Sequence, residues 1–139
     1  MGARKIKLLL DTNILVSAVI SKGNPWKILT GILSEEYIGV TSPQLLAEFS
    51  DIFHKKFPLN IPEYEYIEEQ IKTDFETVNP EIPLDIVRDS SDNKVLEAAI
   101  SGSCNFIVTG DKDLLILKKY KKIRILNPTD FLIEMYSKS

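Results

Sequence analysis

Apolar residues occur along the chain in short continuous runs that alternate with stretches of helical spacing. The short runs predict strands buried on both faces, as in a parallel sheet, at residues 5–10, 37–42, 105–109 and 122–126. The helical spacing predicts helices at residues 12–20, 25–33, 43–56, 63–78, 92–102, 111–120 and 128–136. Strands that alternate with helices in this way predict a three-layer α/β/α fold with a central parallel sheet. We therefore expect an α/β protein, with residues 1–139 as a single domain.

Composition indicates the class of protein and the cellular compartment that we expect. With 44% apolar and 27% charged residues, the chain is typical of a globular protein without low complexity. The single cysteine, Cys104, forms no internal disulfide, which favours a reducing compartment. The first apolar run superficially resembles a secretory signal, but Asp11 and Asn13 interrupt it, and no run approaches the ~18 residues of a membrane span. We expect a cytoplasmic protein that is not bound to a membrane.

Charge is unevenly distributed along the chain. The net charge of -3 argues only weakly against a nucleic-acid partner, because two bound divalent cations would bring it to about +1. Basic residues gather at 4–7 and 118–124, and the second group supplies candidate RNA contacts at Lys118, Lys119, Lys121 and Lys122. An ordinary solvated surface is the alternative interpretation of these lysines.

Several acidic residues fall where a sheet of this kind binds ligands. Asp11 and Asp111 each follow a predicted strand, at the carboxyl edge of the sheet, although each also suits a helix N-cap. Asp92 lies on the core-facing stripe of helix 92–102, with Ser90 or Ser91 as the expected cap, and its inward direction has no structural explanation. Glu48 borders the apolar stripe of its helix. Asp89 either supports Asp92 or is simply solvated.

Convergence of these carboxylates would require a cation. Two carboxylates 4 Å apart repel each other by about 4 kcal/mol at an effective dielectric constant of 20. Oxygen ligands suit Mg²⁺ or Mn²⁺, and a chain with one histidine and one cysteine offers no zinc site. Such a site favours phosphodiester hydrolysis, in which one ion lowers the pKa of an attacking water and another stabilises the leaving oxygen.

Other chemistries fit the residues less well. Glycine-rich phosphate loops are absent from the sequence. His54, the only histidine, has no nucleophile elbow near it, which disfavours a serine hydrolase. An aspartyl-phosphate enzyme would place a second aspartate two residues after Asp11, where this chain has Asn13. A metal-dependent phosphatase for small phosphate esters stays as an alternative.

Five segments in their order along the chain resemble the PIN-domain family: LLLDTNILVSA, SPQLLAEF, DSSDNKVLEAA, IVTGDKDLL and the closing ILNPTDFL. The resemblance implies a metal-dependent ribonuclease, and small members of the family are VapC-like toxins of toxin–antitoxin pairs. It assigns catalysis and metal binding to Asp11, Glu48, Asp92 and Asp111, with Asp113 as an accessory ligand. It further implies that Asn13 and Thr109 orient the first and the last of these acids.

The expected activity is therefore Mg²⁺- or Mn²⁺-dependent cleavage of single-stranded or loop RNA. The resemblance also implies a homodimer and a separately encoded antitoxin. Besides the phosphatase, two further alternatives stay open, namely a housekeeping RNA-processing nuclease and a PIN-like module that binds RNA or protein without cutting. Residues 57–78 would suit a dimer contact or an antitoxin groove, but a solvated helix with one buried face explains them better.

Overall fold

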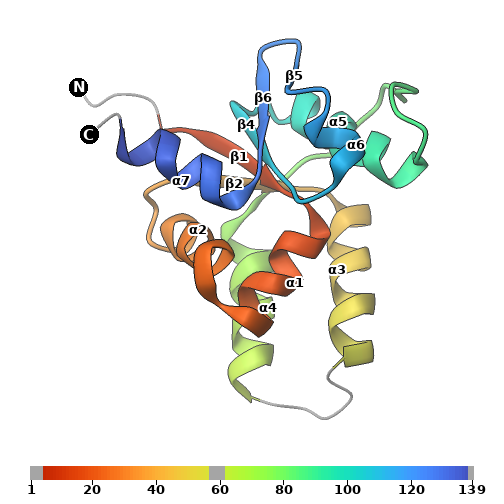
Figure 1. Cartoon of the computed structure of the whole chain (residues 1–139). Coiled ribbons are helices and arrows are strands. Elements are labelled where there is room, and N and C mark those ends of the chain that lie inside the picture. Colours follow the sequence, from red (N-terminus) through yellow and green to blue (C-terminus); the bar gives the residue numbers. More distant parts are fainter. Residues whose placement is uncertain (1–4, 57–61, 138–139) are drawn as a thin grey trace.

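One sheet forms the centre of the computed structural model, which describes residues 5–56 and 62–137 (Figure 1). Its strands are β1 (Lys7–Leu10), β2 (Ile38–Thr41), β3 (Glu76–Thr77), β4 (Phe106–Val108), β5 (Lys119–Tyr120) and β6 (Ile123–Leu126). They lie in the order β3-β2-β1-β4-β6-β5. Neighbouring strands pair in parallel except β5 and β6, which are antiparallel. The predicted central parallel sheet is confirmed.

Helices cover both faces of this sheet, which confirms the three-layer prediction. Residues on one side of β1, Leu8 and Leu10, join a core cluster with α1, α2, α3, α4 and α7, while Leu9 on the opposite side joins a second cluster with α5 and α6. Figure 1 shows α5 and α6 on the other side of the sheet from α1, α2 and α4. The helices are α1 (Thr12–Ser21), α2 (Gly23–Leu33), α3 (Pro43–Lys56), α4 (Pro62–Asp74), α5 (Ser90–Ser101), α6 (Lys112–Leu115) and α7 (Pro128–Tyr136).

The prediction of a helix over residues 63–78 was wrong at its carboxyl end. Helix α4 ends at Asp74, and the chain continues as the edge strand β3 beside β2. The N–H of Val78 donates to the carbonyl of Thr41 at 2.9 Å. The edge of β2 thus offers backbone hydrogen bonds that the chain would not make if the helix continued. Glu76 adds an ion pair with Lys7 at 2.8 Å. Tertiary pairing therefore overrides the local helical pattern.

The predicted helix over residues 111–120 was also too long. Helix α6 covers only Lys112–Leu115, and the chain then forms β5, which pairs with β6 as a hairpin. Lys118, three residues beyond the end of α6, has a φ of 61°, a left-handed conformation that a continuous helix to residue 120 would not allow. Tyr120 packs against the second core cluster.

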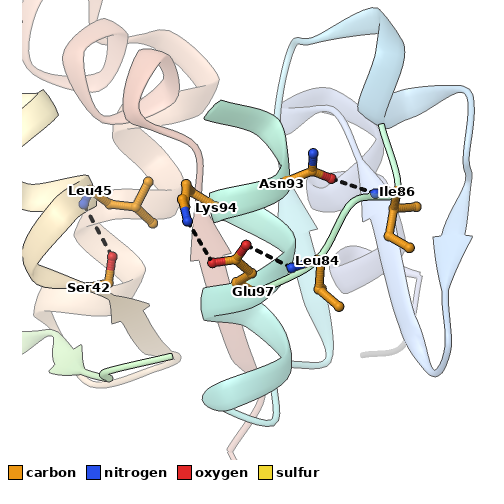
Figure 2. Close-up of polar contacts among 7 residues, drawn as sticks. All are labelled: Ser42, Leu45, Leu84, Ile86, Asn93, Lys94 and Glu97. Atoms are coloured by element: carbon orange, nitrogen blue, oxygen red, sulfur yellow. Dashed lines mark hydrogen bonds and ion pairs between the residues drawn. The ribbon is translucent and has the colours of Figure 1, made fainter. Parts of the chain in front are cut away.

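Helix α3, which carries Glu48, is held against α4 by a buried carboxylate. Glu68 of α4 accepts a hydrogen bond from Ser50 Oγ at 2.8 Å, and His54 Nε2 lies 3.2 Å from its Oε2. His54 therefore has a structural role, because it contacts Glu68 on α4. This role is consistent with the inference that the chain is not a serine hydrolase. Ser42 also caps α3 through its hydroxyl, which accepts from Leu45 N–H at 3.2 Å, as Figure 2 shows.

Two predictions concern residues that lie partly outside the described part of the chain. Residue 4 of the basic segment 4–7 and residues 57–61 of the proposed contact segment are not among the described residues. Cys104 is buried and free. None of the helices in residues 5–56 and 62–137 combines the length and apolar character that crossing a membrane requires.

Candidate functional site

The sheet order places the two strand-end aspartates side by side. Leu10 at the end of β1 is in register with Val108 at the end of β4, and the N–H of Asp11 donates to the carbonyl of Val108 at 3.0 Å. On its other side β1 pairs with β2, so the chain connects away from β1 in both directions. A position where the connections run to opposite sides of one strand is called a topological switch point. A crevice forms there, at the carboxyl ends of the two adjacent strands. Asp11 and Asp111 therefore flank one crevice, as the sequence predicts.

Thr109 joins these two acids through its fully buried hydroxyl. Its Oγ1 donates to Asp11 Oδ2 at 2.7 Å and accepts from the N–H of Asp111 at 3.0 Å. Asp11 occupies the N-cap position of α1, yet its side chain makes no capping hydrogen bond to that helix. The threonine therefore orients the Asp11 carboxylate. Burial raises the pKa of Asp11, and the hydrogen bond from Thr109 opposes part of that rise.

Asp111, in contrast, does act as a helix cap. Its Oδ1 accepts from the N–H groups of Asp113 at 2.8 Å and Leu114 at 3.3 Å at the start of α6. The capping bonds fix the carboxylate in one orientation at the carboxyl edge of the sheet. The cap and the site interpretations of this residue are compatible, because both capping bonds use the same oxygen.

Helix α5 supplies two further acids, Asp89 and Asp92. Asp89 is the N-cap and accepts from Ser91 N–H at 2.9 Å, so the prediction that Ser90 or Ser91 caps this helix was wrong. Helix α5 begins two residues earlier than expected because the extended backbone of Asp89 lets its carboxylate reach the first turn. Gly102 follows the helix as expected, and a Cβ there would meet Val40 Cγ1 at 2.6 Å.

Asp92 is the most unusual of these residues. It is 6% exposed, points inward as predicted, and its Oδ2 has no hydrogen-bond partner among the described residues. Burial raises the pKa of Asp92 to about 7, and the negative charges of Asp111, Asp89 and Asp11 add to the effect. An ionised carboxylate left in this state is destabilising unless a proton or a cation compensates it.

Glu48 reaches the same cleft from α3. It is half-buried, and Thr12 Oγ1 lies 3.4 Å from its Oε2. Burial raises the pKa of Glu48, and the contact with Thr12 opposes it. Thr12 is a contact that the sequence analysis missed, and the only sequence signal for it is its place directly after Asp11.

A cleft of about 470 Å³ collects these side chains. All four predicted catalytic acids line it, together with the exposed Asn13 and Asp89. Asp113 is not part of the lining, but Asp92, Asp111 and Asp113 offer carboxylate oxygens that lie within 4.8 Å of one another. Four further residues line the cleft and were not predicted from the sequence as part of the site, namely Thr12, Asp51, Ile52 and Ser91.

The chemistry of this cleft fits a hard divalent cation. Its candidate ligands are carboxylate oxygens, which Mg²⁺ and Mn²⁺ prefer. Asp92 Oδ2 is buried and has no hydrogen-bond partner in the described part of the chain. A bound cation would supply the partner that this oxygen lacks. Asp92, Asp111 and Asp113 are therefore the residues whose oxygens lie close enough to share such an ion, and Asp11 and Glu48 line the same cleft as Asp92 and Asp111.

The predicted basic residues divide between two cavities. Lys118, Lys119 and Lys122 line a cavity of about 820 Å³, which Arg124 joins, whereas Lys121 lines a different cavity beside α5. Leu126, a wall of the larger cavity, accepts from Thr109 N–H at 3.0 Å. Residues 124–126 of this lining belong to β6, the strand next to β4 in the sheet.

Comparisons with known proteins agree with this architecture. The sequence model of the PIN domain matches residues 7–113. The chain is 36% identical over 146 residues to Uncharacterized protein MJ1680 of Methanocaldococcus jannaschii, covering 94% of this chain and 92% of that protein.

Two solved structures share the fold. A chain of VapBC2 from Rickettsia felis, solved bound to a DNA fragment from its promoter, matches with a TM-score of 0.57 and 16% identity, covering 88% of this chain and 98% of that one. The PIN domain endonuclease Utp24 matches with a TM-score of 0.54 and 20% identity, covering 86% of this chain and 82% of that one.

Proposed function

The chain belongs to the PIN-domain family, and from this premise we propose that it is a metal-dependent endoribonuclease. The substrate is single-stranded or loop RNA, and residues 1–139 act as a single nuclease domain. Asp11, Glu48, Asp92 and Asp111 form the catalytic and metal-binding set, with Asp113 as an accessory ligand. Mg²⁺ or Mn²⁺ is the cofactor, as one or two ions.

The observation that carries this proposal is the state of Asp92. Its buried Oδ2 lacks a hydrogen-bond partner among the described residues, while Asp111 and Asp113 bring further carboxylate oxygens within 4.8 Å. Native proteins retain such a repulsive group where it has a function, because buried polar atoms are otherwise satisfied. A module that only bound RNA or protein would have no use for it.

The chain's own residues hold the site in a fixed geometry. Thr109 orients Asp11 through a 2.7 Å hydrogen bond, and the first turn of α6 holds Asp111. Thr12 faces Glu48 across the cleft at 3.4 Å. When bound, the divalent cation supplies a lowered pKa for an attacking water and charge stabilisation at phosphate oxygens. Such preorganisation lets the residues meet the reacting phosphate without rearranging.

The basic cavity supports an RNA substrate. Lys118, Lys119 and Lys122 line this cavity at β5 and β6, where they are able to hold phosphates of a bound RNA. Lys121 lines a different cavity and contributes less to this binding. Asn13 at the cleft completes the polar surroundings of Asp11.

We further propose that the protein is the toxin of a toxin–antitoxin pair. The resemblance of its motifs to VapC-like toxins supports this role, and the fold that it shares with a chain of VapBC2 is compatible with it. The proposal places it in the cytoplasm, as a homodimer with a separately encoded antitoxin. Light scattering of the purified protein, alone and with the product of a neighbouring reading frame, tests both assemblies.

Cleavage of a mixed-sequence single-stranded RNA by the purified protein tests the enzymatic proposal. Reactions contain Mg²⁺, Mn²⁺ or a chelator, and an Asp11→Asn variant purified in the same way is the control. We expect cutting with metal, none with chelator and none by the variant. A folded wild-type protein that does not cut under any of these conditions would instead favour the binding module.

A further inference from the structure

A buried asparagine fastens the chain that leads into the acidic site. Asn93, 5% exposed on α5, uses its whole side-chain amide for this purpose. Its Oδ1 accepts from the N–H groups of Ile86 at 2.9 Å and Val87 at 3.0 Å, and its Nδ2 donates to the carbonyl of Val87 at 2.9 Å. Figure 2 shows this side chain reaching from α5 to the neighbouring segment. Three bonds from one buried residue fix the backbone at Val87.

Glu97 fastens the same segment one helical turn further along. It is 7% exposed and accepts from the N–H of Leu84 at 3.0 Å and from Lys94 Nζ at 3.3 Å. In Figure 2, Asn93 and Glu97 lie along one side of α5 and face the segment in turn. Residues 84–87 are therefore held against the helix that carries Asp92.

The first residue after this fastened segment is Arg88. Its Nη2 lies 3.6 Å from Oδ1 of Asp113, one of the clustered acids, and its side chain is 90% exposed. Asp89 follows directly and caps α5. The segment thus delivers a solvent-facing guanidinium to the edge of the acidic cluster.

We propose that Arg88 contacts a phosphate of the RNA substrate and that Asn93 is the residue that positions it. The inference rests on the proposed ribonuclease function. A guanidinium presents paired donors that match phosphate oxygens, and an exposed ion pair as long as 3.6 Å is weak enough to exchange for one. A cation shared by Asp92, Asp111 and Asp113 would further release Arg88 from Asp113.

Substitution of Arg88 tests the contact, and its exposure makes misfolding of these variants unexpected. Binding of a fluorescent single-stranded RNA is measured by anisotropy in Ca²⁺ over a range of salt, and cleavage kinetics in Mn²⁺. For Arg88→Ala we expect Kd and KM to rise about tenfold, with kcat less affected. The salt dependence of log Kd should weaken by about 0.7, the value for one phosphate contact on a single strand. Arg88→Lys should fall between, and Lys27→Ala on α2 should match the wild type.

Substitution of Asn93 tests the positioning role. Asn93→Ala should raise Kd and KM as Arg88→Ala does, and the two changes should not add in the double variant, because both remove the same contact. Asn93→Asp keeps the acceptor but places a carboxylate oxygen against the Val87 carbonyl, so we expect its Kd and KM to rise as in Asn93→Ala. It also covers the case in which the alanine variant does not fold. A purely structural Asn93 would lower the melting temperature while the salt dependence of RNA binding stayed unchanged.

The outcomes separate this inference from the proposed function. Wild-type cleavage with unchanged Kd, KM and salt dependence in Arg88→Ala would overturn the Arg88 contact alone. Absence of wild-type cleavage together with weakened binding by Arg88→Ala would overturn the ribonuclease and keep the RNA contact. A wild-type protein that neither binds nor cuts RNA would overturn both. Additive effects of the Arg88 and Asn93 changes would overturn the positioning role.

Discussion

The hydroxyl of Thr109 lies 2.7 Å from Asp11 Oδ2 and ties together two residues that are 98 positions apart in the chain. Each follows a strand of the central sheet, and the strands are direct neighbours. The same hydroxyl accepts from the N–H of Asp111 at 3.0 Å. One buried side chain thus sets the relation between two acids of the candidate metal centre.

Replacement of Thr109 by valine keeps the shape of the side chain and removes this hydroxyl. We expect a loss of about 1–3 kcal/mol in unfolding free energy, because the buried N–H of Asp111 loses its acceptor. Metal affinity should fall by roughly 10- to 100-fold, the usual effect of losing a group that orients a ligand. Denaturant unfolding and Mn²⁺ titration measure the two effects. Thr109→Ser retains the hydroxyl and serves as the control; a valine variant with wild-type metal affinity would refute the orienting role.

The metal-free protein should lose stability as the pH rises. Because the pKa of Asp92 is about 7 in the folded protein and 3.8 in its ordinary state, the folded protein holds the proton more tightly. The protonated Asp92 therefore adds to the unfolding free energy, by a few kcal/mol in order of magnitude. This stabilisation is fully present below pH 3.8 and is lost as the pH rises from 3.8 to about 7. The raised pKa values of Asp11 and Glu48 act in the same direction.

Urea unfolding in chelator across this pH range measures the effect. Asp92→Asn removes the titrating group, so its stability should depend less on pH than that of the wild type. Asp74→Asn, an exposed change at the end of α4, is the matched control and should retain the wild-type dependence. A wild-type protein that gains stability as the pH rises over this interval would contradict the assignment.

Divalent metal should stabilise the folded protein. A ligand at 100 times its Kd adds about 2.7 kcal/mol to the unfolding free energy, which corresponds to several degrees in Tm. We expect Mn²⁺ to raise the Tm of the wild type and of Asp74→Asn, and to leave Asp92→Asn nearly unchanged. Asp113→Asn should keep part of the effect, because Asp113 is the accessory ligand. Equal shifts in all four proteins would place the metal elsewhere.

The basic cavity should contribute to RNA affinity and not to metal binding. Substituting alanine for Lys118, Lys119 and Lys122 together removes three positive charges from its wall. The salt dependence of log Kd for single-stranded RNA should weaken by up to about 2, while the Mn²⁺ shift in Tm stays unchanged. Lys121→Ala changes a neighbouring lysine that lines a different cavity, and it should have little effect. Equal losses in the two variants would show that general charge, and not this cavity, determines binding.

Much of the site follows from the sequence because strand ends have a clear signature. Asp11 and Asp111 each follow an apolar run, and parallel strands bring such residues to one edge. The inward direction of Asp92 follows from helical spacing alone. These inferences depend only on periodicity, which local sequence specifies well.

The remainder depends on contacts between distant segments. Strands β3 and β5 cover two residues each and exist because β2 and β6 offer open edges for pairing. No local pattern shows that Thr109 binds Asp11, or that Asn93 fastens Val87 and thereby places Arg88 beside Asp113. The long-range contacts of Thr109 with Asp11 and of Arg88 with Asp113 become visible only when the fold has brought the partners together.

The most direct test of the central claim is the chemistry of the RNA ends produced by the wild type and by Asp92→Asn. Water-driven, metal-dependent hydrolysis makes no 2′,3′-cyclic phosphate, whereas attack by the neighbouring 2′-hydroxyl does. We predict that the wild type, with Mn²⁺, leaves non-cyclic ends, and that cutting disappears with chelator or in a folded Asp92→Asn variant. Cyclic-phosphate ends, or equal cutting by the two proteins, would contradict the account.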